Sequence, residues 1–195
     1  PHPSVVLRKN GEKVHYISTL EEKEAFMAKL GVDRLYIVTF NKELSQLSPA
    51  QFLQHFIHDL HITHMVAGFD YTFGHKGAGN MQNIDDHTDE ALERTVIQQV
   101  SHEESKVSST AIRAALKAGE VELVNDLLGR PYQATGRVVK GDQRGRTLGF
   151  PTANLEIDEA KLLPEVGVYA VAVAYKGKTY KGMANIGYKP TFRDD

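Results

Sequence analysis

The sequence predicts an α/β domain followed by an all-β, barrel-like module. From residue 19 to about 128, helical periodicity alternates with short apolar runs, which is typical of βαβ units around a parallel sheet. After Gly129, strand-like runs follow one another and no segment has helical periodicity. This change places a domain boundary near 129–131, with the α/β domain over 1–129 and the β module over 130–195.

Helix ends in the first domain carry local signals. Thr19 and Glu22 form a capping box before an apolar helical face that Gly31 ends. Ser48 and Gln51 form a second box, with proline at the first helical position between them. Further helices are predicted over 110–118 and 120–128, and strands over 35–40, 65–68 and 95–100.

The β module is read from four apolar runs without helical period. Strands are predicted over 133–139, 152–157, 168–175 and 179–186. The Lys176-Gly177-Lys178 segment between the last two strands is a hairpin turn signal.

Bulk composition excludes several classes. The chain has 195 residues, 41% hydrophobic and 25% charged, which is ordinary for a globular protein. A net charge of -2 argues against a general nucleic-acid or membrane footprint. The chain has no cysteine, which excludes disulfides and thiol chemistry and fits the cytoplasm. We therefore expect small-molecule substrates, no nucleic acid and no membrane.

Residues 136–155 carry the most specific functional signal. Three cations alternate with three glycines in this segment, namely Lys140, Arg144 and Arg146 with Gly141, Gly145 and Gly149. Glycine lets backbone amides approach a ligand closely, and the cations neutralise a polyanion. Thr152 and Asn154 follow, and in a strand this spacing places their oxygens on one face. Hard oxygen ligands beside such a loop indicate a magnesium-bound phosphate. The alternative is a basic turn leading into an ordinary strand.

A second candidate is the glycine-rich loop from Gly68 to Gly79, which follows a predicted strand and carries Asp70 with three aromatic residues. In open α/β sheets, ligands bind beyond the carboxyl ends of strands, so this loop is a reasonable nucleotide pocket. It contains neither a dinucleotide fingerprint nor a P-loop. The alternative is a flexible surface loop.

A third candidate is the start of the helix predicted from residue 110. Ser108, Ser109 and Thr110 precede Arg113 by one turn, a combination of donors, helix dipole and guanidinium that recognises phosphate. One hydroxyl is needed merely to cap the helix, so capping alone explains Ser108 or Ser109.

Two other clusters are given non-catalytic interpretations. The histidines at 55, 58, 61 and 64 recur every third residue, and this period drifts around a helix, so we interpret them as a solvated face rather than a metal site. The acidic residues within 85–90 are interpreted as an exposed loop.

Taken together, these segments resemble the prokaryotic bifunctional riboflavin kinase/FAD synthetase family. The resemblance rests on GFDYTFG (68–74), VSSTAIRAAL (107–116), LLGRPY (127–132), GRVVKGDQRGRTLGFPTANL (136–155), GVYAV (167–171) and NIGYKPTF (185–192). It implies a Rossmann-like FMN adenylyltransferase domain followed by a six-stranded flavokinase barrel. The implied reactions convert riboflavin to FMN with ATP and Mg²⁺, and FMN to FAD with release of pyrophosphate.

The resemblance also implies roles for individual residues. In the adenylyltransferase, the pocket would be lined by Gly68, Asp70, Phe73, Gly74 and Gly79. The ATP phosphates would be gripped there by Ser108, Ser109, Thr110 and the catalytic Arg113. In the kinase, ATP would be held by Gly136, Lys140, Gly141, Arg144 and Gly145. Thr152 and the catalytic Asn154 would sit at the magnesium ion and the γ-phosphate.

Two departures from the family pattern bear on activity. The family has a GxFDGxHxGH-type histidine loop upstream of the segment matched here, and a glutamate base beyond NIGYKPTF. Neither occurs in this sequence, so we expect a fragment missing both ends, including part of the barrel, with little or no turnover. A flavin or nucleotide sensor and a different nucleotidylyltransferase are the alternatives.

Overall fold

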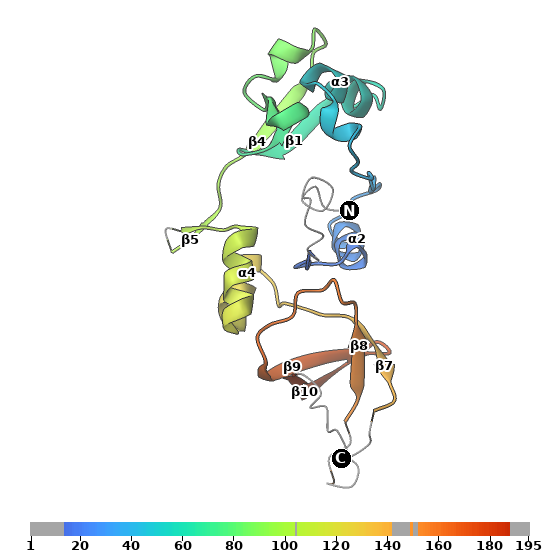
Figure 1. Cartoon of the computed structure of the whole chain (residues 1–195), viewed down its shortest axis with the longest axis vertical. Coiled ribbons are helices and arrows are strands. Elements are labelled where there is room, and N and C mark those ends of the chain that lie inside the picture. The colour runs from blue at the N-terminus through green and yellow to red at the C-terminus, as the bar shows by residue number, and fades with distance from the viewer. Residues whose placement is uncertain (1–13, 104, 142–148, 150–151, 188–195) are drawn as a thin grey trace. The chain divides into compact units, whose positions relative to one another are not determined.

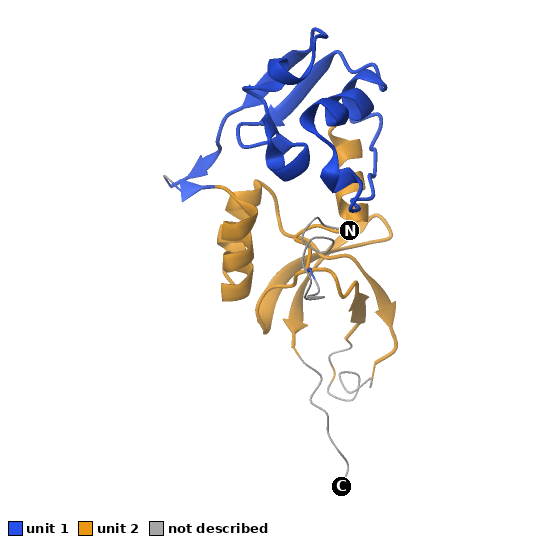
Figure 2. Ribbon diagram, turned by 45° about the horizontal axis from the view of Figure 1, so that its top comes forward, with its two compact units in different colours: residues 1–14, 32–106 blue, residues 15–31, 107–195 orange. Residues whose placement is uncertain are grey.

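The computed structural model describes residues 14–103, 105–141, 149 and 152–187. The chain divides into two compact units, shown in Figure 2. The first contains residues 1–14 and 32–106, and the second contains residues 15–31 and 107–195. Each unit is described by itself.

The first unit is built around a parallel strand pair. Strand β1 (His64–Gly68) lies beside β4 (Glu93–Ile97) in Figure 1. The two strands pair in parallel, with His64 opposite Glu93 and Gly68 opposite Ile97. The parallel pairing confirms the α/β expectation for this part of the chain. The connection between the two strands is not an α-helix. It consists of the short hairpin β2 (Thr72–Phe73) and β3 (Gly79–Asn80) and two 3₁₀ turns, His75–Gly77 and Ile84–His87.

The helix beside this pair begins as predicted. Helix α3 (Pro49–Leu53) has a complete capping box between Ser48 and Gln51, and it continues as a π-helical turn, Gln54–His58. A 3₁₀ turn, Leu44–Gln46, precedes it. The helix buries Leu53 and Ile57 against two residues of the β1–β4 connection, Phe73 and Ile84, and these four residues form a hydrophobic core cluster of the unit.

The strand predicted over 35–40 is wrong. Residues 32–40 form no strand or helix, and Leu35, Tyr36, Ile37 and Val38 are between 38% and 64% exposed. Strand propensity measures how well a side chain fits a pleated, half-buried surface, and among the described residues this run pairs with no strand. The strand predicted over 95–100 is displaced to 93–97.

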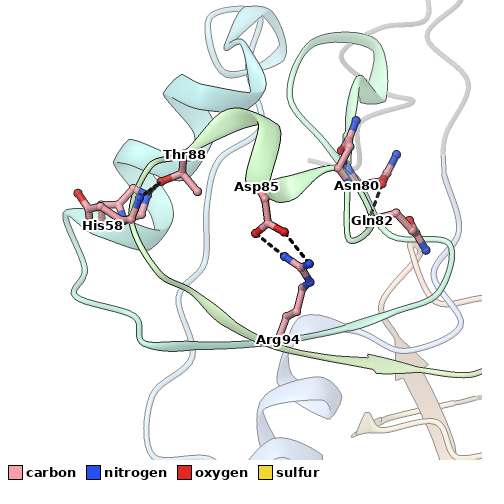
Figure 3. A network of polar contacts seen from close by, with 8 residues as sticks. His58, Asn80, Gln82, Asp85, Thr88 and Arg94 are labelled. Atoms are coloured by element: carbon pink, nitrogen blue, oxygen red, sulfur yellow. Dashed lines mark hydrogen bonds and ion pairs between the residues drawn. The ribbon is translucent and has the colours of Figure 1, made fainter.

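Polar contacts hold the segment between the hairpin and β4 (Figure 3). Arg94 donates to both Asp85 carboxylate oxygens at 2.6 and 2.7 Å, and His58 Nε2 lies 2.9 Å from the Thr88 hydroxyl. The segment predicted as an exposed acidic loop is therefore anchored at Asp85, although that carboxylate remains 68% exposed. A second short hairpin, β5 (Ser101–His102) with β6 (Ser105–Lys106), ends the unit.

Among the described residues, three α-helices belong to the second unit. Helix α2 (Leu20–Lys29) has the predicted capping box between Thr19 and Glu22. Helices α4 (Ser109–Ala118) and α5 (Val121–Leu128) end at Gly119 and Gly129, whose φ values of 76° and 63° are left-handed, as expected for glycine caps. The buried core of these helices consists of Ile112, Ala115, Leu116 and Val124.

The remaining strands of the described residues form two antiparallel pairs. Strand β7 (Gly136–Val139) pairs with β8 (Asn154–Ile157), and β9 (Gly167–Tyr175) pairs with β10 (Lys178–Ile186). Lys176 and Gly177, with φ values of 48° and 75°, make the two-residue hairpin turn. The all-β character predicted after residue 130 is confirmed for the described residues. Within them each sheet has two strands, and none closes into a barrel.

No helix among the described residues is long and apolar enough to cross a membrane.

Candidate functional site

Asp70 lies two residues after the end of β1, at the carboxyl end of the parallel pair. Its Oδ2 accepts a hydrogen bond from Lys106 Nζ at 2.6 Å, and both side chains are exposed. The Lys106 ammonium also lies 4.8 Å from the centre of the Phe69 ring. The hydrogen bond from Lys106 holds the pKa of Asp70 below its usual value. The sequence pattern did not point to Lys106, because its partner lies 36 positions away.

Three other residues of the predicted nucleotide loop have packing roles. Phe73 is 4% exposed and belongs to the core of the first unit. A Cβ atom on Gly79 would overlap the Phe73 ring, and one on Gly74 would lie 2.7 Å from Pro49 N. Gly74 also has a φ of 74°. Both glycines are thus required by the shape of the loop, whereas Gly68 is partly buried and Asp70 is exposed.

The hydroxyls at the start of α4 separate into two kinds. The Ser108 hydroxyl accepts a hydrogen bond from Ala111 N at 3.2 Å, so Ser108 is the capping residue. Ser109 and Thr110 lie in the first turn with exposed side chains. Arg113, one turn further on, is partly buried and its Nη1 donates to the His15 carbonyl at 2.6 Å. These residues belong to the second unit, and Asp70 belongs to the first.

In the predicted kinase site, Gly141 and Asn154 lie against each other. Val139 pairs with Asn154 across β7 and β8, and Lys140 and Gly141 follow β7 directly. A Cβ atom on Gly141 would overlap Asn154 Nδ2, so the amide occupies the space that a side chain would fill. The antiparallel pairing therefore brings Gly141 to the asparagine.

Thr152 and Gly136 are the other described residues predicted for this site. Thr152 is exposed and precedes β8, which begins at Asn154, so the prediction that both lie on one face of a strand is wrong. Gly136 lies close to its partner strand, where a Cβ atom would be 2.7 Å from the Glu156 carbonyl oxygen. Arg144, Gly145 and Arg146 lie outside the described residues.

The histidines singled out in the sequence have separate polar partners. His55 lies 3.3 Å from Asp59, His58 lies 2.8 Å from Glu90, and His64 lies 2.8 Å from the Thr95 hydroxyl. Within the described part of the chain, no three or more His, Cys, Asp or Glu side chains could hold one metal ion.

Two known family models match this chain, one over each part that carries a predicted site. The FAD synthetase family model matches residues 1–111, which include the Asp70 loop and the first hydroxyls of α4. The chain belongs to the FAD synthetase family. The Riboflavin kinase family model matches residues 128–195, which include Gly141 and Asn154.

Individual relatives agree with this assignment. The chain is 48% identical over 195 residues to the bifunctional riboflavin kinase/FMN adenylyltransferase of Listeria monocytogenes, covering 100% of this chain and 62% of that protein. It is 45% identical over 192 residues to the protein of the same name from Bacillus subtilis, covering 98% of this chain and 61% of the relative. The chain thus spans less than two thirds of the length of these relatives.

A solved structure is also similar, the crystal structure of a protein described as a macrolide-efflux protein from Streptococcus pneumoniae. It matches with a TM-score of 0.88 and 34% sequence identity, over 97% of this chain and 62% of that chain. The efflux description belongs to that protein alone, and the likeness supports a common fold.

Proposed function

We propose that the protein containing these residues phosphorylates riboflavin to FMN with ATP, and then adenylylates FMN to FAD with release of pyrophosphate. The observation that carries the proposal is the order of the two family matches along one chain, FAD synthetase and then riboflavin kinase. On this basis residues 1–129 are a Rossmann-like FMN adenylyltransferase domain, and residues 130–195 are part of a flavokinase barrel. The proposed location is the cytoplasm.

In the kinase reaction, the riboflavin 5′-hydroxyl attacks the γ-phosphorus of ATP, and the bond between that phosphorus and the bridging oxygen of ADP breaks. Such transfers depend mainly on positioning and charge stabilisation. Gly141 lets the backbone approach the Asn154 amide closely, and the preceding residue, Lys140, is an exposed cation.

The oxygen donors at this site suit magnesium. Thr152 offers a hydroxyl oxygen and Asn154 an amide oxygen; both residues are exposed, and Asn154 lies against Gly141. These hard donors are the ligands that Mg²⁺ accepts alongside substrate phosphates. Thr152 and Asn154 would hold the ion, which supplies charge neutralisation of the phosphates when bound.

In the adenylyltransferase reaction, an FMN phosphate oxygen attacks the α-phosphorus of ATP and pyrophosphate leaves. Negative charge develops on the phosphoryl oxygens, and preorganised donors stabilise it. Arg113 supplies a guanidinium already fixed by the His15 carbonyl, and Ser109 and Thr110 supply exposed hydroxyls at the positive end of α4.

Separate assays of the two steps test the proposal in the whole protein. Asn154→Ala should abolish FMN formation from riboflavin while FAD formation from supplied FMN persists, and Arg113→Ala should have the opposite effect. Glu156→Ala and Arg137→Ala are matched controls, because this exposed cross-strand pair on β7 and β8 lies outside the proposed machinery.

Product chromatography distinguishes the alternatives. Flavin fluorescence quenching without FMN or FAD product in the wild type would indicate a sensor. Turnover of a pantetheine or sugar phosphate in place of FMN would indicate a different nucleotidylyltransferase.

A further inference from the structure

A buried ion pair in the second unit joins segments that are distant in sequence. Lys161 Nζ lies 2.6 Å from Glu22 Oε2, and the two side chains are 1% and 4% exposed. The ammonium group also lies 4.5 Å from the centre of the Tyr132 ring. Glu22 lies in the part matched by the FAD synthetase model, and Lys161 lies in the part matched by the riboflavin kinase model.

Because the Glu22–Lys161 pair is buried, it fixes the relative position of the two residues more than it stabilises the fold. Burying two charges carries a desolvation penalty that the ion pair repays only when its geometry is good, so such pairs are weak sources of stability. Desolvation lowers the pKa of Lys161, whereas its hydrogen bond with Glu22 acts in the opposite direction. Glu22 Oε2 also accepts from Thr19 N in the α2 capping box, at 3.1 Å. The pair therefore ties the start of α2 to Lys161.

Lys161 also fixes the residues that precede α2. Its Nζ donates to the Ile17 carbonyl at 2.8 Å. Two main-chain hydrogen bonds join the same segments: Tyr16 N donates to the Ala160 carbonyl at 2.6 Å, and Leu162 N donates to the Tyr16 carbonyl at 2.8 Å. Residues 15–17 thus lie along residues 160–162, with Tyr16 and Lys161 forming a parallel bridge.

The same segment holds Arg113. Its Nη1 donates to the His15 carbonyl at 2.6 Å, two residues from the carbonyl that Lys161 contacts. We propose that Lys161 is a positioning residue for Arg113, acting through the main chain of residues 15–17. A guanidinium with one donor fixed loses less conformational freedom when its remaining donors bind phosphate.

This inference rests on the proposed function, because it gives Arg113 the role of binding the ATP phosphates. It adds that a residue in the riboflavin kinase match sets ATP affinity in the adenylyltransferase. Lys161 itself touches no substrate.

The experiment measures the KM for ATP in both reactions of the whole protein. Replacing Lys161 by Met should raise the KM for ATP about tenfold with FMN as acceptor, because the segment holding Arg113 loosens. With riboflavin as acceptor, the KM for ATP should change less than about twofold. Lys117→Met is the control, because Lys117 is an exposed lysine on α4, the helix that carries Arg113.

A milder variant, Glu22→Gln, and a double-mutant cycle of Lys161 with Arg113 provide further tests of the positioning role. Glu22→Gln keeps an oxygen that accepts from both Thr19 N and Lys161, so it should raise the same KM less than Lys161→Met does. If Lys161→Met does not fold, Glu22→Gln decides the question alone. Adding Lys161→Met to Arg113→Lys should have little further effect on this KM, because the two changes disrupt one interaction.

The outcomes separate the two levels of proposal. Absence of FAD formation by the wild type would overturn the proposed function. Suppose that the wild type is active and that Arg113→Lys raises the KM for ATP in FAD formation. If Glu22→Gln and Lys161→Met then leave this KM unchanged, only the positioning role is overturned. Equal increases in both reactions would also overturn it, because they indicate a general structural defect.

Discussion

At the scale of single residues, the contact between Gly141 and Asn154 constrains the proposed kinase site most tightly. Gly141→Ala would place a methyl group in overlap with Asn154 Nδ2, so the amide has to move. We expect riboflavin phosphorylation to fall by about a hundredfold or more, because displacement of a positioned group by about 1 Å has effects of this size. FMN formation, measured by chromatography, checks this.

Gly182→Ala is the matched control for that variant. Gly182 lies in β10, and a Cβ atom there would have only an ordinary contact with Val171 at 3.9 Å. Equal activity of the two variants would contradict the proposed role of the Gly141 contact.

The exposed pair of Asp70 and Lys106 predicts that its contribution to folding stability depends on pH. The pKa of Asp70 is lowered from 3.8, first by the hydrogen bond from Lys106. A carboxyl with a depressed pKa in the folded state adds stability above its unfolded pKa, and this contribution disappears as the pH falls through the folded value. The pair is therefore intact near neutral pH.

Lys106→Met should raise the pKa of Asp70 toward 3.8, measured by NMR titration of its side-chain carboxyl. Asp85 serves as an internal control, because its own pKa is lowered by Arg94 and should not change. An unchanged Asp70 titration would show that the pair does not persist in solution.

At the scale of elements, different hydroxyls at the start of α4 have the capping role and the proposed ligand-binding role. Ser108→Ala removes the cap to Ala111 N and should cost about 1 kcal/mol of unfolding free energy. Ser109→Ala removes no capping bond, so it should change stability by less than about 0.5 kcal/mol. Urea unfolding of the two variants measures both values.

The same two variants should differ in function in the opposite sense. Ser109→Ala should raise the KM for ATP in FAD formation, because its exposed hydroxyl is proposed to bind phosphate. A loss of stability with Ser109→Ala equal to that with Ser108→Ala would show that the capping assignment is wrong.

At the scale of the whole molecule, the second unit is assembled from residues 15–31 and residues 107–195. Lys161→Met leaves the Glu22 charge buried without its partner, which typically costs about 3–5 kcal/mol. Adding Glu22→Gln removes that charge and should recover part of the loss. Amide hydrogen exchange in α2 should be faster in the single variant than in the double variant.

Urea unfolding supplies the second measurement of this coupling, with Lys117→Met as the control for loss of an exposed lysine. A double variant as unstable as the sum of the two single variants would mean that Glu22 and Lys161 act independently.

Local signals in the sequence determined much of the structure correctly. The boxes at Thr19 and Ser48, the glycine cap at Gly119 and the turn at Lys176-Gly177 each depend on residues a few positions apart. A capping bond or a left-handed φ is decided by nearby atoms, so it can be predicted without knowing the rest of the fold.

Only the tertiary structure decided which groups meet across long distances. The apolar run at 35–40 needed a neighbouring strand, and Phe73 proved to be a core residue. Lys106 and Lys161 found their acidic partners 36 and 139 positions away. Residue type and spacing identify chemistry within a motif, but burial and pairing depend on which surfaces the folded chain brings together.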